Sequence, residues 1–194
     1  MNNNPSNPTT IQSFLSGDKI FLRGLRHEDM ESYRNWLDNP ETTKFMESGW
    51  KPTSNKDIEN LYHASTENSD TVAFAIIDQS TGQLIGCCGL YLIQWICRRA
   101  EFRIIIGEPS ACNKGFGREV AELVISYGFN QLNLENIYLG VNCKNKGAIK
   151  SYQYAGFINE GIRRKLIYIN GLYYDVLMMS ILKEEYFATL NKQP

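Results

Sequence analysis

The spacing of apolar residues changes repeatedly along the chain, and each change predicts a different element of secondary structure. Short apolar or alternating runs that end at turn residues are typical of strands, whereas apolar residues three and four apart indicate one face of a helix. These patterns predict, in chain order, strand 19–25, helix 27–39, helix 54–65, strands 71–78, 84–93 and 98–106, helix 117–132, strand 135–142, helix 145–156, and strands 156–169 and 172–182. The chain therefore combines helices with a sheet.

Individual residues support several of these boundaries. Ser54 is a favourable N-cap for a helix with Asp57 at its third position, and Pro40 ends the helix before it. Asn170-Gly171 is the strongest short signal for a hairpin turn. Hairpin-like connections also join the strands between residues 71 and 106. We therefore predict an α/β fold of the α+β kind, with a mixed, mostly antiparallel sheet.

The length and composition favour one domain with a sizeable core. A chain of 194 residues falls within the roughly 100–200 residues that one core commonly serves, and 43% of the residues are hydrophobic. We predict a flexible polar tail at residues 1–18 and a single domain at residues 19–190. Because 20 basic residues accompany 21 acidic ones, the chain lacks the positive field that attracts nucleic acid or an anionic membrane. A small-molecule partner fits this charge better.

The cysteines, histidines and apolar runs narrow the location and the chemistry. Five cysteines are an odd number without the paired spacing of a zinc site, which favours reduced thiols in a cytoplasmic protein. His27 and His63 are the only histidines, so we expect no multi-histidine metal site. The chain has no signal-peptide pattern and no apolar run of about 20 residues, so secretion and membrane insertion are not expected.

Two glycines before the predicted helix 117–132 are candidates for a ligand-binding loop. Gly115 and Gly117 let the backbone approach a ligand closely, and the first N–H groups of the helix point toward an anion such as a pyrophosphate. Lys114 and Arg118 add positive charge beside them. The alternative is a turn that needs glycine only for its conformation. A Walker loop and a dinucleotide fingerprint are excluded, because the chain has neither GxxxxGK followed by Ser or Thr nor a third glycine.

The segments AEFRIII, CNKGFG and LENIYLGVNCKNKGAIKSYQYAGF resemble, in this order, the acetyl-CoA-binding core of the GNAT N-acetyltransferases. The similarity is to the RimJ/RimL type, which includes spermidine N-acetyltransferases, and it is sharpest between Arg99 and Phe157. It implies a GNAT acyltransferase fold for residues 19–190, with helices on both faces of a sheet that splits at the fourth and fifth strands. Acetyl-CoA is the implied co-substrate, no metal is implied, and a homodimer is compatible with the family.

The resemblance assigns binding roles to the glycine loop and its surroundings. In the family, the loop amides hold the pyrophosphate of coenzyme A. Gly115 and Gly117 fit that motif, whereas Cys112 stands where the family has Gln or Arg and Asn113 where a glycine is common. The strand before the loop pairs with pantetheine in the family, and an asparagine after it contacts the pantetheine arm or nearby backbone. The residues implied for the cofactor are Ile104, Ile105, Ile106, Cys112, Asn113, Lys114, Gly115, Phe116, Gly117, Arg118, Asn145, Ala148 and Tyr152.

The resemblance also implies two catalytic residues. Tyr152 is expected near the thioester sulfur, where a phenol can stabilise or protonate the departing thiolate; the alternative is that it packs on the sheet. Glu101 is the candidate base, because an amine attacks a thioester only when it is neutral. The alternative for Glu101 is a salt bridge with Arg98, Arg99 or Arg103.

The expected reaction is direct acetyl transfer from acetyl-CoA to a primary amine, without a covalent enzyme intermediate. A thiol route through Cys112 or Cys143 lacks a histidine that would orient the nucleophile. A polyamine, an amino sugar or a similar small molecule is favoured as acceptor, because the apolar and aromatic residues of loop 42–54 and of the hairpin at Asn170-Gly171 can enclose it. Six acidic residues between positions 28 and 47 either attract a polycation or are simply solvated. The alternatives are a protein N-terminal acetyltransferase and a non-catalytic acyl-CoA-binding module.

Overall fold

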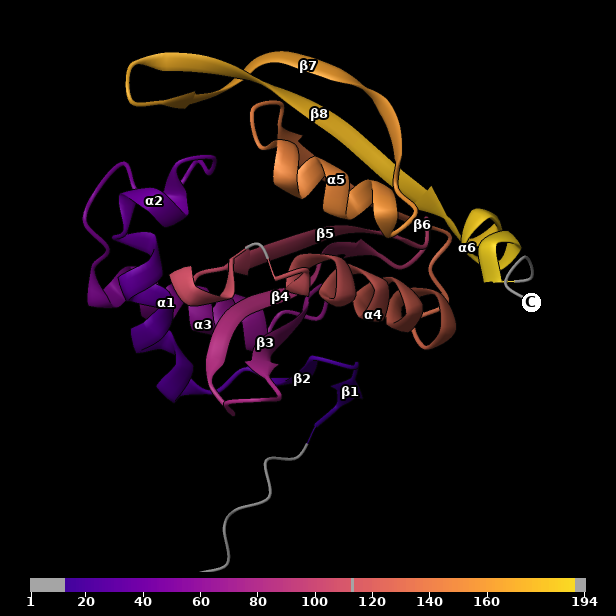
Figure 1. Cartoon of the computed structure of the whole chain (residues 1–194), viewed down its shortest axis with the longest axis horizontal. Helices are drawn as coiled ribbons and strands as arrows, with labels where there is room; N and C mark the ends of the chain where they lie inside the picture. Colours follow the sequence, from indigo (N-terminus) through magenta and orange to yellow (C-terminus); the bar gives the residue numbers. More distant parts are fainter. Residues whose placement is uncertain (1–12, 113, 191–194) are drawn as a thin grey trace, which may run out of the picture.

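Within residues 13–112 and 114–190, which the computed structural model describes, eight strands form one mixed sheet in the order β1-β2-β3-β4-β5-β6-β8-β7 (Figure 1). All neighbouring strands are antiparallel except β5 and β6, which are parallel. The strands are β1 Leu15–Ser16, β2 Ile20–Gly24, β3 Val72–Asp78, β4 Leu84–Gln94, β5 Arg99–Ile106, β6 Asn136–Asn142, β7 Ile158–Ile169 and β8 Leu172–Leu182. The mixed, mostly antiparallel sheet predicted from the sequence is confirmed.

Helices cover both faces of this sheet (Figure 1). Two neighbouring residues of β4 show the two layers, because successive side chains of a strand point to opposite faces. Cys87 packs with Trp36 of α1, whereas Cys88 belongs to the cluster that contains Val124 of α4. The helices are η1 His27–Asp29, α1 Met30–Leu37, α2 Pro40–Thr43, α3 Asn55–Thr66, η2 Pro109–Ala111, α4 Phe116–Asn130, α5 Lys146–Tyr154 and α6 Lys183–Leu190.

The main core lies between α4 and the sheet. Val120 and Val124, four residues apart on the face that the sequence predicted, are 0% exposed, and Phe129 of the same helix is 1% exposed. They pack with buried residues of the strands, including Leu90 and Ile137. Each fully buried side chain of this size contributes about 1.5–3 kcal/mol to folding. This core fixes the position of the α4 N-terminus relative to β5.

The sheet opens between β5 and β6. The parallel ladder joins Arg99, Ala100 and Glu101 to residues 136–138, and in the described chain it extends no further. β6 nevertheless continues beside β8 as far as the pair Asn142 and Val176. The segment Ile104–Ile106 of β5 therefore has an open backbone edge toward β6. Because β1 was not among the predicted strands, β5 and β6 are the fourth and fifth strands predicted from the sequence. This opening is therefore the split that the family resemblance implied.

Local signals in the sequence are matched by specific contacts. Ser54 accepts a hydrogen bond from the backbone N–H of Asp57, and the Asp57 carboxylate accepts one from the backbone N–H of Ser54, so the predicted capping box is present. The turn at Asn170-Gly171 joins β7 to β8, with both residues at positive φ. The capping box fixes the start of α3, and the turn at Asn170-Gly171 forms the tip of the outer hairpin.

Four elements were not predicted: β1, α2, η2 and α6. The expected tail includes Leu15–Ser16, which instead forms β1 by pairing with Leu22 and Phe21 of β2, while residues 1–12 of that tail lie outside the described residues. Phe14 stacks on Phe74 at a ring distance of 5.6 Å, which anchors this segment to the sheet. The helices α2 and η2 have four and three residues, too few to show a helical period. Helix α6 was also missed, and none of its residues is buried.

Candidate active site

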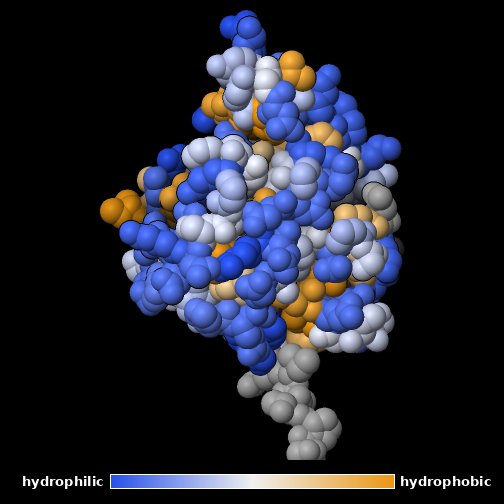
Figure 2. All heavy atoms as spheres, turned by 90° about the vertical axis from the view of Figure 1, so that its left-hand side faces the viewer, coloured by the Kyte–Doolittle hydropathy of each residue, from blue (hydrophilic) through white to orange (hydrophobic). Residues whose placement is uncertain are grey.

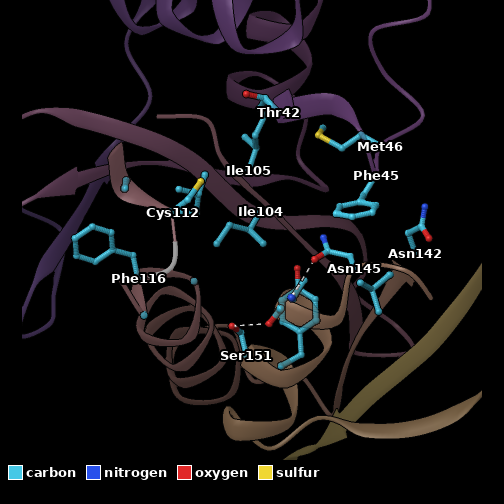
Figure 3. Close-up of a pocket in the computed structure, with 18 of the residues that line it drawn as sticks. Thr42, Phe45, Met46, Ile104, Ile105, Cys112, Phe116, Asn142, Asn145 and Ser151 are labelled. Carbon is cyan, nitrogen blue, oxygen red and sulfur yellow. Dashed lines mark hydrogen bonds between the residues drawn. The ribbon is translucent and has the colours of Figure 1, made fainter. Parts of the chain in front are cut away.

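A cavity of about 370 Å³ lies at the split between β5 and β6 (Figure 3). It is bordered by the open edge of β5, the end of β6 and the N-termini of α4 and α5. The segment around α2, residues 37–50, closes another side. Its lining is Thr42, Phe45, Met46, Ile104, Ile105, Ile106, Ala111, Cys112, Gly115, Phe116, Gly117, Gly140, Val141, Asn142, Asn145, Gly147, Ala148, Ser151 and Tyr152. The sequence-predicted motifs of β5, the glycine loop and α5 thus meet in one place.

The two glycines of the loop serve different purposes. Gly115 is the N-cap of α4 and has a φ of 85°, a conformation that other residues rarely adopt. Gly117 lies in the first turn of α4 without a positive φ, and a Cβ built on it meets no atom within 4 Å. Neither backbone conformation nor protein packing therefore requires glycine at position 117. A side chain at position 117 would instead occupy the cavity in front of the α4 N-terminus.

Asn145 holds the start of α5. Its side-chain oxygen accepts a hydrogen bond of 3.1 Å from the backbone N–H of Ala148, which is an N-cap contact. Asn145 and Ala148 both line the cavity, as the sequence motif implied. The N-termini of α4 and α5 therefore both border the same space, and helix N-termini favour negative charge and carbonyl oxygens.

Tyr152 lies on α5 and lines the same cavity. Its ring makes edge contacts with Phe102 and Phe157, at centroid distances of 6.1 and 5.9 Å. Burial raises the pKa of the Tyr152 phenol to about 12. The phenol therefore keeps its proton throughout the neutral range, where it can donate a hydrogen bond or a proton but cannot act as a base. The packing alternative and the catalytic role are compatible, since the ring packs while the residue borders the cavity.

Glu101 is held by a salt bridge. Its carboxylate accepts a hydrogen bond of 2.6 Å from Arg103, and its side chain is 23% exposed. Arg103 also lies over the ring of Tyr91, at 5.1 Å. Glu101 is not among the residues that line the cavity. The observed contact is thus the salt bridge that the sequence left as the alternative to a catalytic base.

The basic residues beside the glycines do not line the cavity. Lys114 borders a separate cavity with Asp18, Lys19 and Asp78 on its wall, and it lies near enough to Asp78 to help lower the pKa of that carboxyl group. Arg118 pairs with Glu122 at 2.7 Å. Cys112 does line the cavity, as an exposed free thiol. Asn113 lies outside the described residues.

Several lining residues were not predicted as site residues. Thr42, Phe45 and Met46 belong to the segment around α2, and the sequence indicated only that this loop could cover a site. Gly140, Val141 and Asn142 come from β6, and Gly147 and Ser151 from α5. The β6 residues could have been inferred from the family split, because a ligand between two strands touches both of them.

Another cavity, of about 300 Å³, adjoins the cavity at the split, the reaction cavity, and Met46 lines both. We call it the second cavity; it is distinct from the cavity beside Lys114. It lies between the segment around α2 and the tip of the β7–β8 hairpin, which extends toward α2 (Figure 1). Asp38, Glu47 and Trp50 lie on one side of it and Tyr168 on the other. The face of the molecule that carries this region is mainly hydrophilic (Figure 2). Lys44 also lines this cavity and pairs with Glu41 at 3.1 Å. Loop 42–54 and the hairpin therefore enclose a cavity whose wall carries two carboxylates and one paired ammonium group.

Two features are absent from the residues that the structure describes. Among the described residues, none of the helices is long and apolar enough to cross a membrane. In the same part of the chain, groups of three His, Cys, Asp or Glu side chains that could hold a metal ion are absent.

A sheet that opens between two parallel strands, with a glycine-bordered helix N-terminus at the opening, defines an acyl-CoA-using transferase. Residues 19–158 match the family described as acetyltransferase (GNAT) domain. The chain is 33% identical over 178 residues to spermidine N(1)-acetyltransferase of Vibrio cholerae serotype O1, covering 91% of this chain and 94% of that protein. It is 35% identical over 181 residues to the spermidine N(1)-acetyltransferase of Escherichia coli K12, covering 89% and 91%.

The fold shows the same relationship. The crystal structure of spermidine N-acetyltransferase from Vibrio cholerae in complex with CoA and spermine superposes with a TM-score of 0.79 at 33% identity, over 87% of this chain and 98% of that one. The chain belongs to the GNAT acetyltransferase family. The GNAT fold and the acetyl-CoA-dependent N-acetyltransferase activity expected from the sequence are therefore confirmed.

Proposed function

We propose that this N-acetyltransferase acetylates a primary amine of a polyamine, with acetyl-CoA bound in the split between β5 and β6. The observation that carries the proposal is the cavity that joins the open edge of Ile104–Ile106 to the α4 N-terminus and to the segment around α2. The relatives named above act on spermidine, and one of them binds CoA and spermine.

The residues of the cavity fit acetyl-CoA. The open edge of β5 can pair with the amides of an extended pantetheine arm as with an added strand. The N–H groups at the start of α4 can hold a pyrophosphate, and Gly117 leaves the space that such a group needs. Because Cys112 replaces the usual Gln or Arg and neither Lys114 nor Arg118 borders the cavity, backbone amides carry most of this binding.

Tyr152 is the proposed hydrogen-bond donor to the leaving thiolate. Burial raises the pKa of Tyr152 to about 12, so the phenol is protonated when the thiolate leaves. The same burial raises the proton affinity of the departing sulfur. Hydrogen bonding from the phenol stabilises the charge as it develops on sulfur.

Carboxylates beside the second cavity support a polycationic acceptor. Asp38 and Glu47 line the cavity that adjoins the reaction cavity through Met46. The lining of the reaction cavity itself contains no carboxylate. In this arrangement the neutral amine reacts in the first cavity, while a charged amine of the same molecule lies near the carboxylates of the second.

An acceptor panel tests this proposal. With acetyl-CoA and equal concentrations of spermidine, spermine, an amino sugar, an aminoglycoside and a peptide with a free N-terminus, we expect thiol release with the polyamines and little with the peptide. A polyamine can lie in the space between the segment around α2 and the hairpin tip, whereas a peptide N-terminus must enter as an extended chain. Robust transfer to the peptide alone would move the protein to the N-terminal acetyltransferases, and binding of acetyl-CoA without transfer to any amine would make it an acyl-CoA-binding module.

Glu101 remains a proposed base, acting through a water because it does not line the cavity. If it accepts the amine proton, Glu101→Gln should lower the rate on the order of 10²-fold near pH 7. The defect should shrink as the pH rises, because a larger share of the amine is then already neutral. Glu135→Gln is the matched control, since Glu135 also pairs with an arginine, Arg98, and is not part of the cavity wall. A defect that is equal at every pH would show that the ion pair with Arg103 is only structural.

Two further expectations stay predictions, the cytoplasmic location and the homodimer. The outer strand β7 favours a homodimer, because it is an edge strand with exposed Ile158, Ile162 and Leu166.

A further inference from the structure

The amide of Asn142, the last residue of β6, lines the reaction cavity and is 4% exposed. Its side-chain oxygen accepts a hydrogen bond of 2.9 Å from the backbone N–H of Lys144. Because that partner is a donor, it identifies which end of the amide is oxygen and which is nitrogen. The nitrogen, Nδ2, carries two N–H donors and has no hydrogen-bond partner among the described residues.

An unpartnered donor at this position requires an explanation, because buried polar groups are nearly always hydrogen-bonded. Two other described side chains, Asn136 and Arg34, also contain a buried polar atom without a partner. Neither of them lines the reaction cavity. Figure 3 shows Asn142 beside Phe45 and Asn145 at one end of the cavity, with Cys112 and Phe116 at the other. Asn142 thus differs from the other two because it belongs to the wall of this cavity.

The register of the strands locates Asn142 along that ligand. The last residues paired across the split are Glu101 and Tyr138, and Asn142 lies four residues beyond Tyr138. At about 3.3 Å per residue, this is about 13 Å from the closed end of the split. The glycine loop follows the other strand, β5, at the open end. A pyrophosphate at that loop places the acyl group toward the closed end, so Asn142 lies on the β6 side of the arm that connects them.

We propose that Nδ2 of Asn142 donates a hydrogen bond to an amide carbonyl oxygen of the pantetheine arm of acetyl-CoA. The open edge of β5 binds the arm from one side of the split, and Asn142 binds it from the β6 side. The hydrogen bond to Lys144 keeps the amide oriented for this contact. Asn142 is therefore a cofactor-binding residue that the sequence motifs did not indicate. This inference rests on the proposed binding of acetyl-CoA in the split.

Asn142→Asp tests the donor with almost no change in shape. Aspartate can still accept the hydrogen bond from Lys144, but it has no N–H group to offer and turns an oxygen toward the carbonyl. By calorimetry, we expect the dissociation constants of CoA and of acetyl-CoA to rise by the same factor, about ten- to a hundredfold. Binding of the phospho-ADP portion of CoA, which lacks pantetheine, should stay within twofold of the wild type.

Asn142→Ala is the second variant, in case a buried carboxylate prevents folding. It should show the same selective loss for CoA and acetyl-CoA, with a melting temperature close to that of Asn136→Ala. Asn136 is a matched control, because it is an asparagine of the same strand with a buried unpartnered atom outside the cavity. Asn136→Ala should bind all three ligands as the wild type does.

Three outcomes would overturn the inference. CoA affinity could be unchanged in both Asn142 variants, the phospho-ADP portion could lose as much affinity as CoA, or only acetyl-CoA could be weakened, which would move the contact to the thioester carbonyl. If the wild-type protein itself binds neither CoA nor acetyl-CoA, the failure lies in the proposed function instead.

Discussion

Replacing Tyr152 by phenylalanine is expected to lower turnover on the order of 10²-fold while leaving the affinity for acetyl-CoA nearly unchanged. The substitution keeps the ring, and with it the edge contacts to Phe102 and Phe157 that hold α5 on the sheet. Only the hydroxyl group is lost, and with it the hydrogen-bond donor that we propose for the leaving thiolate. Single-turnover rates and equilibrium binding, measured on the same preparation, separate these two effects.

The pKa of Tyr152 sharpens this experiment. Because burial raises that pKa to about 12, the phenol stays protonated between pH 6 and pH 10. The ratio of wild-type to variant rates should therefore be constant over this range. Tyr154→Phe is the control, since Tyr154 lies on the same helix but is 68% exposed and contacts Arg118 rather than the cavity. Wild-type turnover in the Tyr152 variant would show that the residue only packs.

The sequence predicted those parts of the fold that local interactions determine. The start of α3 follows from Ser54 and Asp57, whose side chain and backbone groups satisfy each other, and the hairpin tip follows from Asn170-Gly171. Helix α4 could be predicted because its buried face repeats over fifteen residues. Such signals depend on neighbours in the chain, so they can be read without knowing the fold.

Other features depend on contacts between distant segments and could not be read in this way. The pairing of Leu15–Ser16 with β2 rests on two residues, which is too short for a period. The second cavity arises because the segment around α2 and the hairpin tip, more than a hundred residues apart, lie on opposite sides of one space. The sequence indicated six acidic residues between positions 28 and 47, but no local pattern distinguishes Asp38 and Glu47, which line this cavity, from the other four.

The residues of the candidate site also fall into two groups, those that sequence motifs indicated and those that depend on contacts made on folding. The glycine loop, Asn145 and Tyr152 were indicated by motifs of fixed spacing, and the structure brings them to one cavity. Whether Lys114 and Arg118 point into it depends on which neighbours compete for them, and Glu122 holds Arg118 along the helix instead. Asn142 carried no signal, because its importance lies in an unpartnered atom that exists only after folding.

Gly117→Val should remove acetyl-CoA binding without unfolding the protein. A side chain at position 117 meets no protein atom within 4 Å, so it projects into the cavity in front of the α4 N-terminus, where the proposal places the pyrophosphate. For the wild type, acetyl-CoA at 100 times its dissociation constant should add about 2.7 kcal/mol of stability. In a chain of this length that corresponds to a rise of about 5–11 °C in melting temperature.

In the Gly117→Val variant, that ligand-induced rise should fall below about 1 °C at the same ligand concentration, while the melting temperature without ligand stays within a few degrees of the wild type. Gly24→Val is the matched control, because a Cβ on Gly24 also meets no atom within 4 Å and Gly24 lies in β2, outside the cavity lining. The control variant should show the full ligand-induced rise. An equal rise in both variants would mean that Gly117 serves only the turn into α4, and that the phosphate end of the co-substrate binds elsewhere.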